Sequence, residues 1–314
     1  DHPQNVGMLG MHGNYGPNVL TNECDVLIAV GMRFDDRVTG RLDKYAKQAK
    51  VIHLDIDPSE IDKNVKADVG VWGDCKETLP LLTLGIEQKD RSEWLKVFAS
   101  YTQQEYDQCI KEEIYPATDE MTMGEVIRIV NETTLGNAVM VTDVGQHQMV
   151  TCRYAKFNES RSNVTSGGLG TMGFGLPAAI GAKFGAQDRT VIAVIGDGGI
   201  QMTIQELGTI MQTGVDVKIM ILNNQFLGMV RQWQQLFNDK RYSFVDIQSP
   251  DYVMVAKAYG IEGAKISHRH ELDQGIKTML AHKGSYLLEV MVGKENNVFP
   301  MVPQGCSVSE IRLK

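Results

Sequence analysis

Two residues that suit a magnesium ion directly follow two buried apolar runs. The first run, Val191–Ile195, leads into Gly-Asp-Gly-Gly, and the second, Val217–Leu222, leads into Asn-Asn. In a parallel sheet both strand ends open on one edge, where α/β folds bind their ligands. Asp197 and Asn224 would then lie close together, and a carboxylate with an amide oxygen suits Mg²⁺ when a diphosphate supplies the other ligands. The alternative is two unrelated turns at strand ends. The presence of Asn-Asn at the end of the second buried run, at a matching distance from Gly-Asp-Gly, argues against this alternative.

The rest of the chain alternates apolar runs with helical stretches. A helix is expected between the two runs, over Thr203–Gln212, and the absence of hairpin turn signals favours a parallel sheet. We therefore predict an α/β fold with doubly wound parallel sheets. Further strands are expected at Asp25–Val30, Val51–Asp55, Ala67–Val71, Ala138–Thr142, Gly263–Ile266 and Tyr286–Val292, and further helices at Pro177–Phe184, Tyr252–Tyr259 and Glu271–His282.

Composition divides the chain into three parts. Residues 1–75 carry three strand candidates, residues 76–117 are polar and helix-forming, and residues 118–314 hold the remaining strands. We interpret the middle part as a helical linker and the last part as a second α/β domain. Its first helix is expected to begin after Thr122, with Glu125 three residues on as in a capping box. Because three strands are few for a domain and the chain starts without Met, we expect it to belong to a longer protein.

The composition argues against several kinds of partner. With 314 residues, 43% of them hydrophobic, the chain can bury one large core or two. The net charge of −8 argues against nucleic acid or an anionic membrane surface as the main partner. No apolar run reaches the roughly 18 residues that a membrane span needs. The five cysteines are scattered without a C-x-x-C pair, which suits reduced thiols and a cytoplasmic location.

One glycine-rich loop matches a dinucleotide-binding motif. Residues 168–173 read Gly-Leu-Gly-Thr-Met-Gly, fit G-x-G-x-x-G and lead into an expected helix. No buried strand is expected before them, and the next acidic residue at a suitable distance, Asp188, falls in a polar loop. We therefore expect no nicotinamide dinucleotide at this loop.

Several stretches resemble acetohydroxyacid synthase, also called acetolactate synthase, in its catalytic subunit. They are G-M-H-G at 10–13, R-F-D-D-R-V-T-G at 33–40, G-Q-H-Q at 145–148, G-G-L-G-T-M-G at 167–173, M-V-R-Q-W at 229–233 and P-M-V-P at 300–303. This family depends on thiamine diphosphate, and its metal signature resembles the Gly-Asp-Gly and Asn-Asn pair. The resemblance implies that residues 1–75 are the C-terminal part of a Rossmann-like, FAD-associated middle domain. It implies that residues 118–314 are the diphosphate-binding domain with a C-terminal tail.

The resemblance also implies an activity. The family joins the acetyl unit of one pyruvate to a second 2-oxo acid, pyruvate or 2-oxobutyrate, and releases CO₂. The products are early intermediates of branched-chain amino acid biosynthesis, leading to isoleucine and valine. A homodimer or tetramer of the full-length form and a small regulatory subunit are implied as well.

Site residues follow from the same resemblance. Asp197, Asn224 and the backbone carbonyl of Phe226 would bind Mg²⁺, although the family usually has another side chain at Phe226. The diphosphate would contact Gln146, His147 and backbone N–H groups near Gly198 and Gly199 at a helix start. The alternative for His147 is a structural loop histidine without a ligand.

Two residues of the glycine-rich loop would face the reacting part of the cofactor. Met172 would hold thiamine diphosphate in a bent shape, and the carbonyl of Gly170 would accept a hydrogen bond from its amino group. The bent shape lets the cofactor deprotonate itself, so that the protein supplies geometry. On its own, a methionine in such a loop more often simply packs.

Two further sets of residues complete the implied site. Arg37 would bind the carboxylate of the second 2-oxo acid and Trp233 would contact its extra methyl group, whereas a salt bridge and core packing are the ordinary roles of such residues. FAD, which takes no redox part in this reaction, would lie at Met11, His12, Arg33 and Asp36, and it is expected in the full-length enzyme rather than in this chain alone.

Catalysis by this chain alone is not expected. In the family a glutamate on an N-terminal domain of a neighbouring subunit activates the cofactor, and no stretch here resembles that domain. Other interpretations are another thiamine-diphosphate-dependent 2-oxo acid decarboxylase or carboligase, a catabolic acetolactate synthase without FAD, and a non-catalytic nucleotide-binding or regulatory module.

Overall fold

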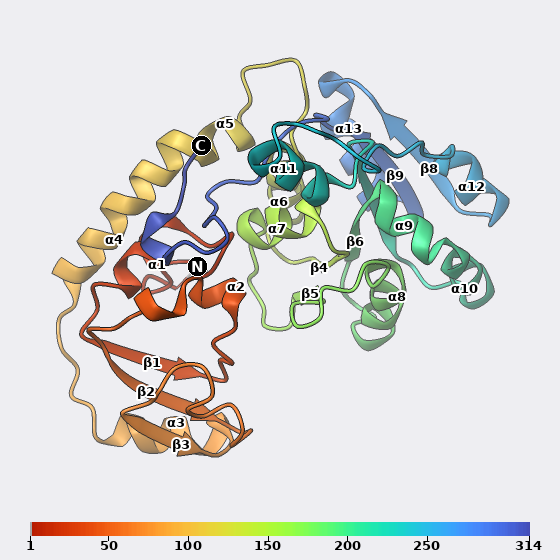
Figure 1. The fold of residues 1–314 in the computed structure, drawn as a ribbon. Helices are drawn as coiled ribbons and strands as arrows, with labels where there is room; N and C mark the ends of the chain where they lie inside the picture. Colours follow the sequence, from red (N-terminus) through yellow and green to blue (C-terminus); the bar gives the residue numbers. More distant parts are fainter. Residues whose placement is uncertain (1) are drawn as a thin grey trace. The chain divides into compact units, whose positions relative to one another are not determined.

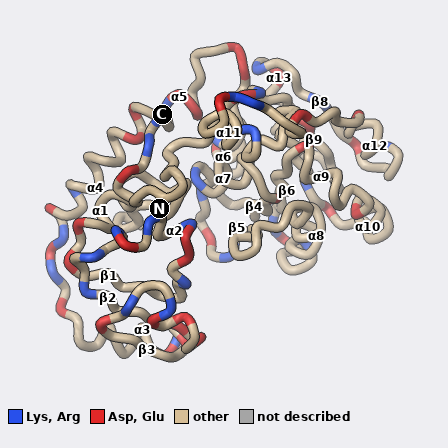
Figure 2. The backbone as a smooth tube through the Cα atoms, in the orientation of Figure 1, with Lys and Arg blue, Asp and Glu red and all other residues tan. Residues whose placement is uncertain are grey.

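The computed structural model describes residues 2–314, which form two compact units (Figure 1). The first unit comprises residues 2–110 and 299–314, and the second comprises residues 111–298. Asp1, where the expected first domain begins, lies outside the described residues. Acidic and basic residues are spread over both units (Figure 2).

A parallel six-stranded sheet forms the centre of the second unit. Its strand order is β5-β4-β6-β7-β9-β8, and every neighbouring pair runs parallel. The predicted doubly wound α/β fold is confirmed. The strands are β4 (Val139–Thr142), β5 (Asn163–Thr165), β6 (Val191–Gly196), β7 (Lys218–Asn223), β8 (Glu262–Ile266) and β9 (Tyr286–Met291).

Helices cover both faces of this sheet, which explains why its strands are apolar throughout. Along β6 the side chains alternate: Ile192 and Val194 pack into one core cluster, and Ala193 and Ile195 into the other. The first cluster contains residues of α6 and α13, and the second contains residues of α8, α10 and α12. The helices are α5 (Lys111–Ile114), α6 (Met123–Thr134), α7 (Gln146–Tyr154), α8 (Gly175–Gly185), α9 (Asp197–Met202), η3 (Ile204–Glu206), α10 (Leu207–Thr213), α11 (Gly228–Phe237), α12 (Tyr252–Ala258) and α13 (Arg269–Ala281).

The strand order reverses between β4 and β6. The chain passes from β4 to β5 on one side, and β6 pairs with β4 on the other side. Such a reversal leaves a crevice beyond the carboxyl ends of the two strands, where open α/β sheets bind ligands. The loops after β4, β6 and β7 are therefore the segments that can build a site.

Three local expectations for this unit differ from the structure. Helices α7 and α9, which begin at Gln146 and at Asp197 itself, were not among the expected helices. The expected helix over Thr203–Gln212 consists of the short 3-10 helix η3 followed directly by α10. Thr203 lies before η3, and its hydroxyl donates a hydrogen bond to the Gly173 carbonyl at 2.9 Å. The short edge strand β5 precedes the glycine-rich loop, where no strand was expected.

The capping box expected at α6 is half formed. The Thr122 hydroxyl accepts a hydrogen bond from the Glu125 backbone N–H at 3.1 Å, as an N-cap should. The Glu125 carboxylate instead forms an ion pair with Arg269 at 2.9 Å. Glu125 therefore ties α6 to α13 rather than closing the reciprocal bond.

A smaller parallel sheet, ordered β1-β2-β3, lies in the first unit. Ala29 of β1 and Val51 of β2 pack into a core with Phe34, Tyr45 and Val308. The strands are β1 (Val26–Val30), β2 (Lys50–Asp55) and β3 (Val69–Trp72), and the helices are α1 (Tyr15–Thr21), α2 (Asp36–Thr39), η1 (Leu42–Lys44), α3 (Cys75–Leu84), α4 (Ser92–Glu105), η2 (Tyr106–Ile110) and η4 (Val308–Glu310).

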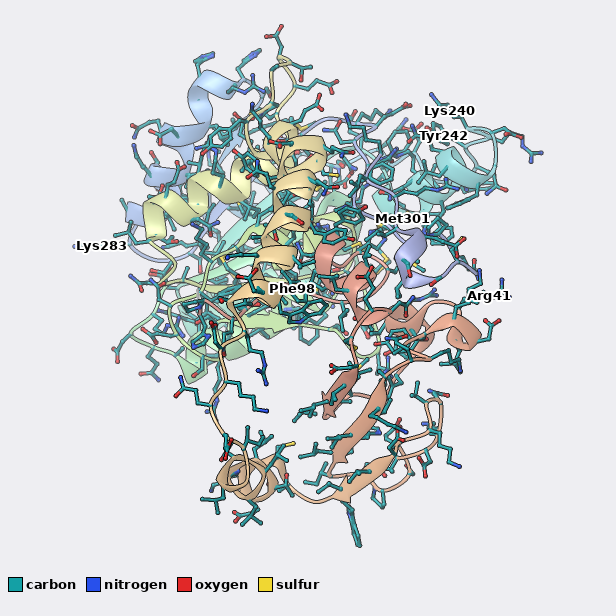
Figure 3. All side chains as sticks on the ribbon, turned by 90° about the vertical axis from the view of Figure 1, so that its left-hand side faces the viewer. Arg41, Phe98, Lys240, Tyr242, Lys283 and Met301 are labelled. Carbon is teal, nitrogen blue, oxygen red and sulfur yellow. The ribbon has the colours of Figure 1, made fainter. Side chains whose placement is uncertain are left out.

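The long helix α4 packs on α1, so most of the expected linker belongs to the first unit. The buried carboxylate of Glu105 accepts hydrogen bonds from the Tyr15 backbone N–H at 2.7 Å and from Asn14 Nδ2 at 3.0 Å. These bonds satisfy the start of α1, where backbone N–H groups lack helical partners. Phe98, labelled in Figure 3, lies about two turns before Glu105 on the same helix, against Gly16.

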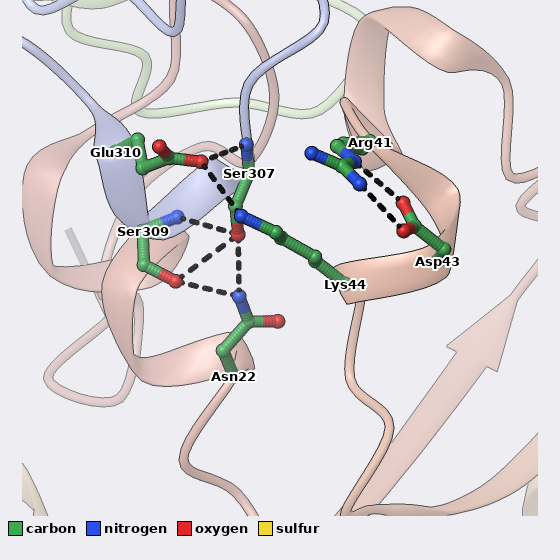
Figure 4. A network of polar contacts seen from close by, with 7 residues as sticks. All are labelled: Asn22, Arg41, Asp43, Lys44, Ser307, Ser309 and Glu310. Atoms are coloured by element: carbon green, nitrogen blue, oxygen red, sulfur yellow. Dashed lines mark hydrogen bonds and ion pairs between the residues drawn. The ribbon is translucent and has the colours of Figure 1, made fainter.

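The C-terminal tail, residues 299–314, also groups with the first unit, whereas it was expected with the second domain. Ser307 pairs with Gly40 in a β-bridge, and its hydroxyl accepts a hydrogen bond from Asn22 Nδ2 at 3.0 Å (Figure 4). Lys44 forms an ion pair with Glu310 at 3.7 Å. Several polar groups of the tail thus have their partners in residues 22–44, and others bond to Met11 and Cys109, so the tail is held by the first unit at several points.

Glu113 of α5 should make the stability of the second unit depend on pH. Its carboxylate accepts a hydrogen bond from the Gly124 N–H at 3.0 Å, yet burial raises its pKa from 4.5 to about 7. The folded chain thus keeps a proton that the unfolded chain loses, and stability falls as pH rises from about 4.5 to about 7. We expect Glu113→Gln to remove this slope and to add about 1–2 kcal/mol at pH 8.

Urea unfolding at pH 5 and pH 8 would measure this effect. Glu112→Gln, an exposed neighbour on the same helix, is the matched control for the loss of one charge. Equal responses of the two variants at both pH values would contradict the role given to Glu113.

Candidate functional site

A pocket of about 310 Å³, open to solvent, lies beyond the ends of β4, β6 and β7. We call it the strand-end pocket. Residues that the sequence singled out as metal or diphosphate ligands line it together, as does Met172. These are Gln146, His147, Met172, Asp197, Gly198, Gly199, Asn224 and Phe226.

Asp197 places a buried carboxylate at the pocket. It follows β6 as the first residue of α9 and is 1% exposed. Its carboxylate is close to Ser249 Oγ at 3.5 Å, and Tyr252 donates a hydrogen bond to its backbone carbonyl at 2.6 Å. Burial raises the pKa of this carboxyl to about 7, and among the described residues no basic side chain forms an ion pair with it. A buried carboxylate without a cation is the kind of group that a metal ion stabilises.

Asn224 and Phe226 belong to the tight turn after β7. Gln225 between them has φ +58°, the left-handed region that a side chain disfavours. Asn224 Nδ2 donates a hydrogen bond to Gln146 Oε1 at 3.2 Å, and Asn224 Oδ1 accepts one from the Phe226 N–H at 3.3 Å. The Phe226 ring is buried beneath the Lys294 ammonium, 4.5 Å from its centroid. The turn is thus held on both sides of Gln225.

Gln146 and His147 open α7 after β4. Gln146 Nε2 donates hydrogen bonds to Gln232 Oε1 and to the Asn296 carbonyl, both at 2.9 Å, which fixes the orientation of its amide. Burial lowers the pKa of His147 to about 4, against the opposing charge of Asp143, so the ring is neutral at pH 7. His147 Nε2 is buried and has no hydrogen-bond partner within residues 2–314. A neutral imidazole with one unused nitrogen suits an anionic ligand as a hydrogen-bond donor.

The walls of the pocket leave no room for side chains at two glycines. A Cβ atom at Gly199 would lie 2.6 Å from Asp143 Oδ1. One at Gly228 would collide with the Gln146 side-chain oxygen. Glycine is therefore needed at both positions so that the Asp143 and Gln146 side chains can occupy their places.

Asp143 is a site residue that we did not predict. It is buried directly after β4, and its carboxylate accepts hydrogen bonds from the backbone N–H groups of Val144 (2.8 Å), Gly173 (3.0 Å) and Gly175 (2.8 Å). Gly173 ends the glycine-rich loop that carries Met172, and Gly175 is the first residue of α8. Asp143 thus ties this loop to the end of β4, and its place directly after a buried run was the available signal.

Gly170 and Trp233 do not line the strand-end pocket. Gly170 is exposed with φ +63°, and its N–H donates a hydrogen bond to the Ser166 carbonyl at 3.0 Å. Trp233 is half-buried on α11 with its ring 4.9 Å from that of Phe237. Gln232, its neighbour, is the residue of this motif that contacts the pocket, through Gln146.

Two family models match the chain. One is described as "Thiamine pyrophosphate enzyme, C-terminal TPP binding domain" and matches residues 143–290, and the other as the central domain of thiamine pyrophosphate enzymes and matches residues 1–82. The acetolactate synthase isozyme 2 large subunit of Escherichia coli is 42% identical, with 100% of this chain and 56% of the relative aligned. The chain is a homologue of acetolactate synthase large subunits over its whole length and carries the central and C-terminal domains of thiamine pyrophosphate enzymes.

Other members of the acetolactate synthase family align equally fully. The large subunit of Lactococcus lactis is 40% identical over 99% of this chain and 53% of its own length. Acetolactate synthase 1, chloroplastic, of Nicotiana tabacum is 41% identical over 98% of this chain and 47% of its own length. The chain spans about half the length of the curated relatives it matches.

The remaining candidate residues of this homologue of acetolactate synthase lie in the first unit. Met11, Asp36 and Arg37 line a second pocket of about 350 Å³ together with residues 302–305 of the tail, which we call the tail pocket. Arg37 and Asp36 are exposed and 3.8 Å apart. His12 is buried and Arg33 pairs with Asp35 at 3.0 Å, but neither lines the tail pocket.

No helix within residues 2–314 combines the length and the apolar character that a membrane span needs.

Proposed function

We propose that the second unit binds thiamine diphosphate through Mg²⁺. Asp197, Asn224 and the Phe226 carbonyl are the proposed metal ligands, and Gln146, His147 and the backbone at Gly198 and Gly199 adjoin the diphosphate. The observation that carries this proposal is the buried Asp197 carboxylate without a cation, on the same pocket as Asn224. The unpartnered His147 Nε2 adds a donor for the anion.

For the longer protein we propose acetolactate synthase activity, the joining of an acetyl unit from pyruvate to a second 2-oxo acid with loss of CO₂. The names of the relatives and the match to the thiamine pyrophosphate domain model support it. Thiamine diphosphate, when bound, supplies the stabilisation of the carbanion that this chemistry needs. The proposed role of this chain is to position the cofactor and to exclude water from the site.

Each pocket residue has a physical task in this proposal. Asp143 holds the glycine-rich loop so that Met172 lines the pocket, and Gln232 orients the amide of Gln146. Neutral His147 donates from Nε2 without adding a positive charge that would compete with the metal. These groups are buried and prepositioned, so little reorganisation is needed when the ligand binds. Gly170 remains a proposed acceptor for the amino group of the cofactor.

We propose FAD and a small regulatory subunit as partners of the longer protein, with assembly as a homodimer or tetramer. The "large subunit" in the names of the relatives supports the regulatory subunit. Of the four proposed FAD residues, Met11 and Asp36 share the tail pocket whereas His12 and Arg33 do not, so these residues do not form one cradle. We derive no reaction step through FAD.

Calorimetric titration of the chain with thiamine diphosphate tests the cofactor proposal. We expect saturable binding with one site per chain in the presence of Mg²⁺, and loss of that binding in EDTA. Thiamine, which lacks the diphosphate, is the matched ligand control and should bind far more weakly. Equal binding of the two ligands, or no binding at any Mg²⁺ concentration, would overturn the proposal.

Trp233 and Arg37 are proposed to contact the second 2-oxo acid. If the Trp233 indole meets the extra methyl group of 2-oxobutyrate, Trp233→Leu in the full-length protein should lower its preference over pyruvate by roughly tenfold. Product ratios from mixed substrates would measure this. Phe237→Leu, which changes the ring that Trp233 packs against, is the control for general loosening of α11. An unchanged ratio in Trp233→Leu would leave Trp233 a packing residue.

A further inference from the structure

A buried carboxylate outside the strand-end pocket is bonded to the turn that carries Asn224. Glu289 lies within β9 and its side chain is fully buried. Its Oε1 accepts hydrogen bonds from Asn223 Nδ2 at 2.7 Å and from Lys265 Nζ at 3.3 Å. Glu289 does not line the pocket, so contact with a ligand does not account for a charge at this position.

The carboxylate determines which way the Asn223 amide points. A carboxylate accepts hydrogen bonds and has none to donate, so the NH₂ group of Asn223 faces Glu289 and Oδ1 faces the other way. Asn223 Oδ1 accepts a hydrogen bond from the Gln225 backbone N–H at 3.0 Å. This N–H belongs to the residue with left-handed backbone, the conformation that needs outside support.

We propose that Glu289 is a positioning residue for the metal site, acting through Asn223 on the turn that presents Asn224 and the Phe226 carbonyl. The inference rests on the Mg²⁺ site proposed above. Lys265 of the edge strand β8 neutralises the buried charge, because its ammonium pairs with the carboxylate while half of its side chain stays exposed. An ion pair at the sheet edge is thereby linked to the orientation of the proposed ligands.

Exchanging the hydrogen-bond donor, Asn223, and the acceptor, Glu289, distinguishes a positioning role of Glu289 from a role in packing alone. In Glu289→Gln the new amide presents either end to Asn223, so the orientation of Asn223 is no longer fixed. Asn223→Asp sets two carboxylates against each other. In the double variant the introduced aspartate accepts from both the Gln225 N–H and the introduced amide, which restores one defined arrangement with the same total charge.

The Mg²⁺ concentration for half-maximal binding of thiamine diphosphate is the first readout, measured by calorimetry. We expect Glu289→Gln to raise this Mg²⁺ concentration about tenfold, which is within the range for residues that orient metal ligands. Asn223→Asp should raise it further. In the double variant it should return to within about threefold of the parent value. Glu262→Gln, an exposed carboxylate on β8, is the matched control. Hydrogen exchange of the backbone amides of residues 222–228 without ligand is the second readout, expected to quicken about tenfold in each single variant and to recover in the double variant.

Each outcome decides one proposal. No binding by the parent chain would overturn the metal site and, with it, this inference. Binding by the parent that disappears in Asp197→Ala, with an unchanged Mg²⁺ requirement in Glu289→Gln, would overturn the positioning role alone. A loss in Glu289→Gln that the double variant does not restore would also overturn it, because packing would then be the cause. Should Glu289→Gln fail to fold, a folded double variant with the parent's Mg²⁺ requirement supports the proposal, and an unfolded one overturns it.

Discussion

Thiamine diphosphate binding should fall by at least about 100-fold when Asp197 is replaced by alanine. The side chain is the one carboxylate among the proposed ligands, and its removal leaves the diphosphate without a properly held counter-ion. In ligand-free protein the same change should raise the free energy of unfolding, because burial without a cation disfavours the charged form of the Asp197 carboxyl. Calorimetry in Mg²⁺ would measure the affinity, and urea unfolding the stability.

Asp188→Ala is the matched control for this change. Asp188 is exposed in the loop before β6, so its removal alters the net charge equally without touching the pocket. Affinity within about twofold of the parent is expected for the control. If Asp197→Ala also bound thiamine diphosphate at the parent's affinity, Asp197 would not be a metal ligand.

Asp143→Ala should disorder the glycine-rich loop and destabilise the second unit by about 3 kcal/mol or more. Its carboxylate is the acceptor for the N–H groups of Val144, Gly173 and Gly175, and an unsatisfied buried donor costs about 1–3 kcal/mol. Hydrogen exchange of residues 167–175 would measure the loop directly, and urea unfolding the stability. Thiamine diphosphate affinity should fall with it, since Met172 lies on this loop.

Asp143→Asn tests the need for a carboxylate at the same position. One amide oxygen can still accept, but the NH₂ group then opposes a backbone N–H, so we expect an effect between those of the parent and of alanine. The loss of charge should also lower the pKa of His147 further, because Asp143 is the group that raises it. If the hydrogen exchange of residues 167–175 in both variants matched that of the parent, Asp143 would not be the residue that holds the glycine-rich loop at the end of β4.

The sequence alone predicts that Asp197 and Asn224 lie near each other, because each residue directly follows an apolar run. Two continuous apolar runs predict buried parallel strands, and parallel strands put their carboxyl ends on one edge. The observed register, with Gly196 opposite Leu222, brings both strands to an end together. The proximity of these two residues therefore follows from the apolar pattern and the parallel strand direction, whereas the other site residues were expected from the family resemblance.

Other parts of the site depend on local geometry that the sequence hides. Helix α7 begins after Gly145, whose φ is +152°, and this residue offers no side chain to cap the helix. Asp143 gains its role because the chain folds back and presents two N–H groups some thirty residues later. Neither feature produces a hydrophobic period or a recognised cap.

The position of the tail could not be derived from local patterns. Residues 299–314 have no helical or strand period, and their partners, such as Gly40 for Ser307, lie at the other end of the chain. Similarly, α4 looks like a linker because only one of its residues, Glu105, is buried, and its carboxylate accepts a hydrogen bond from the N–H of Tyr15 at the start of α1. Contacts at such separation are set by tertiary packing.

The division of the first unit between residues 2–110 and 299–314 affects how the chain folds during synthesis. The ribosome must make the whole second unit, roughly 190 residues, before the tail emerges, which takes on the order of 10–40 s. For that time Phe34 and Tyr45 lack Val308, their core partner from the tail. The first unit therefore cannot complete its core until the tail has been synthesised. The second unit is continuous in sequence, so it is able to finish folding first.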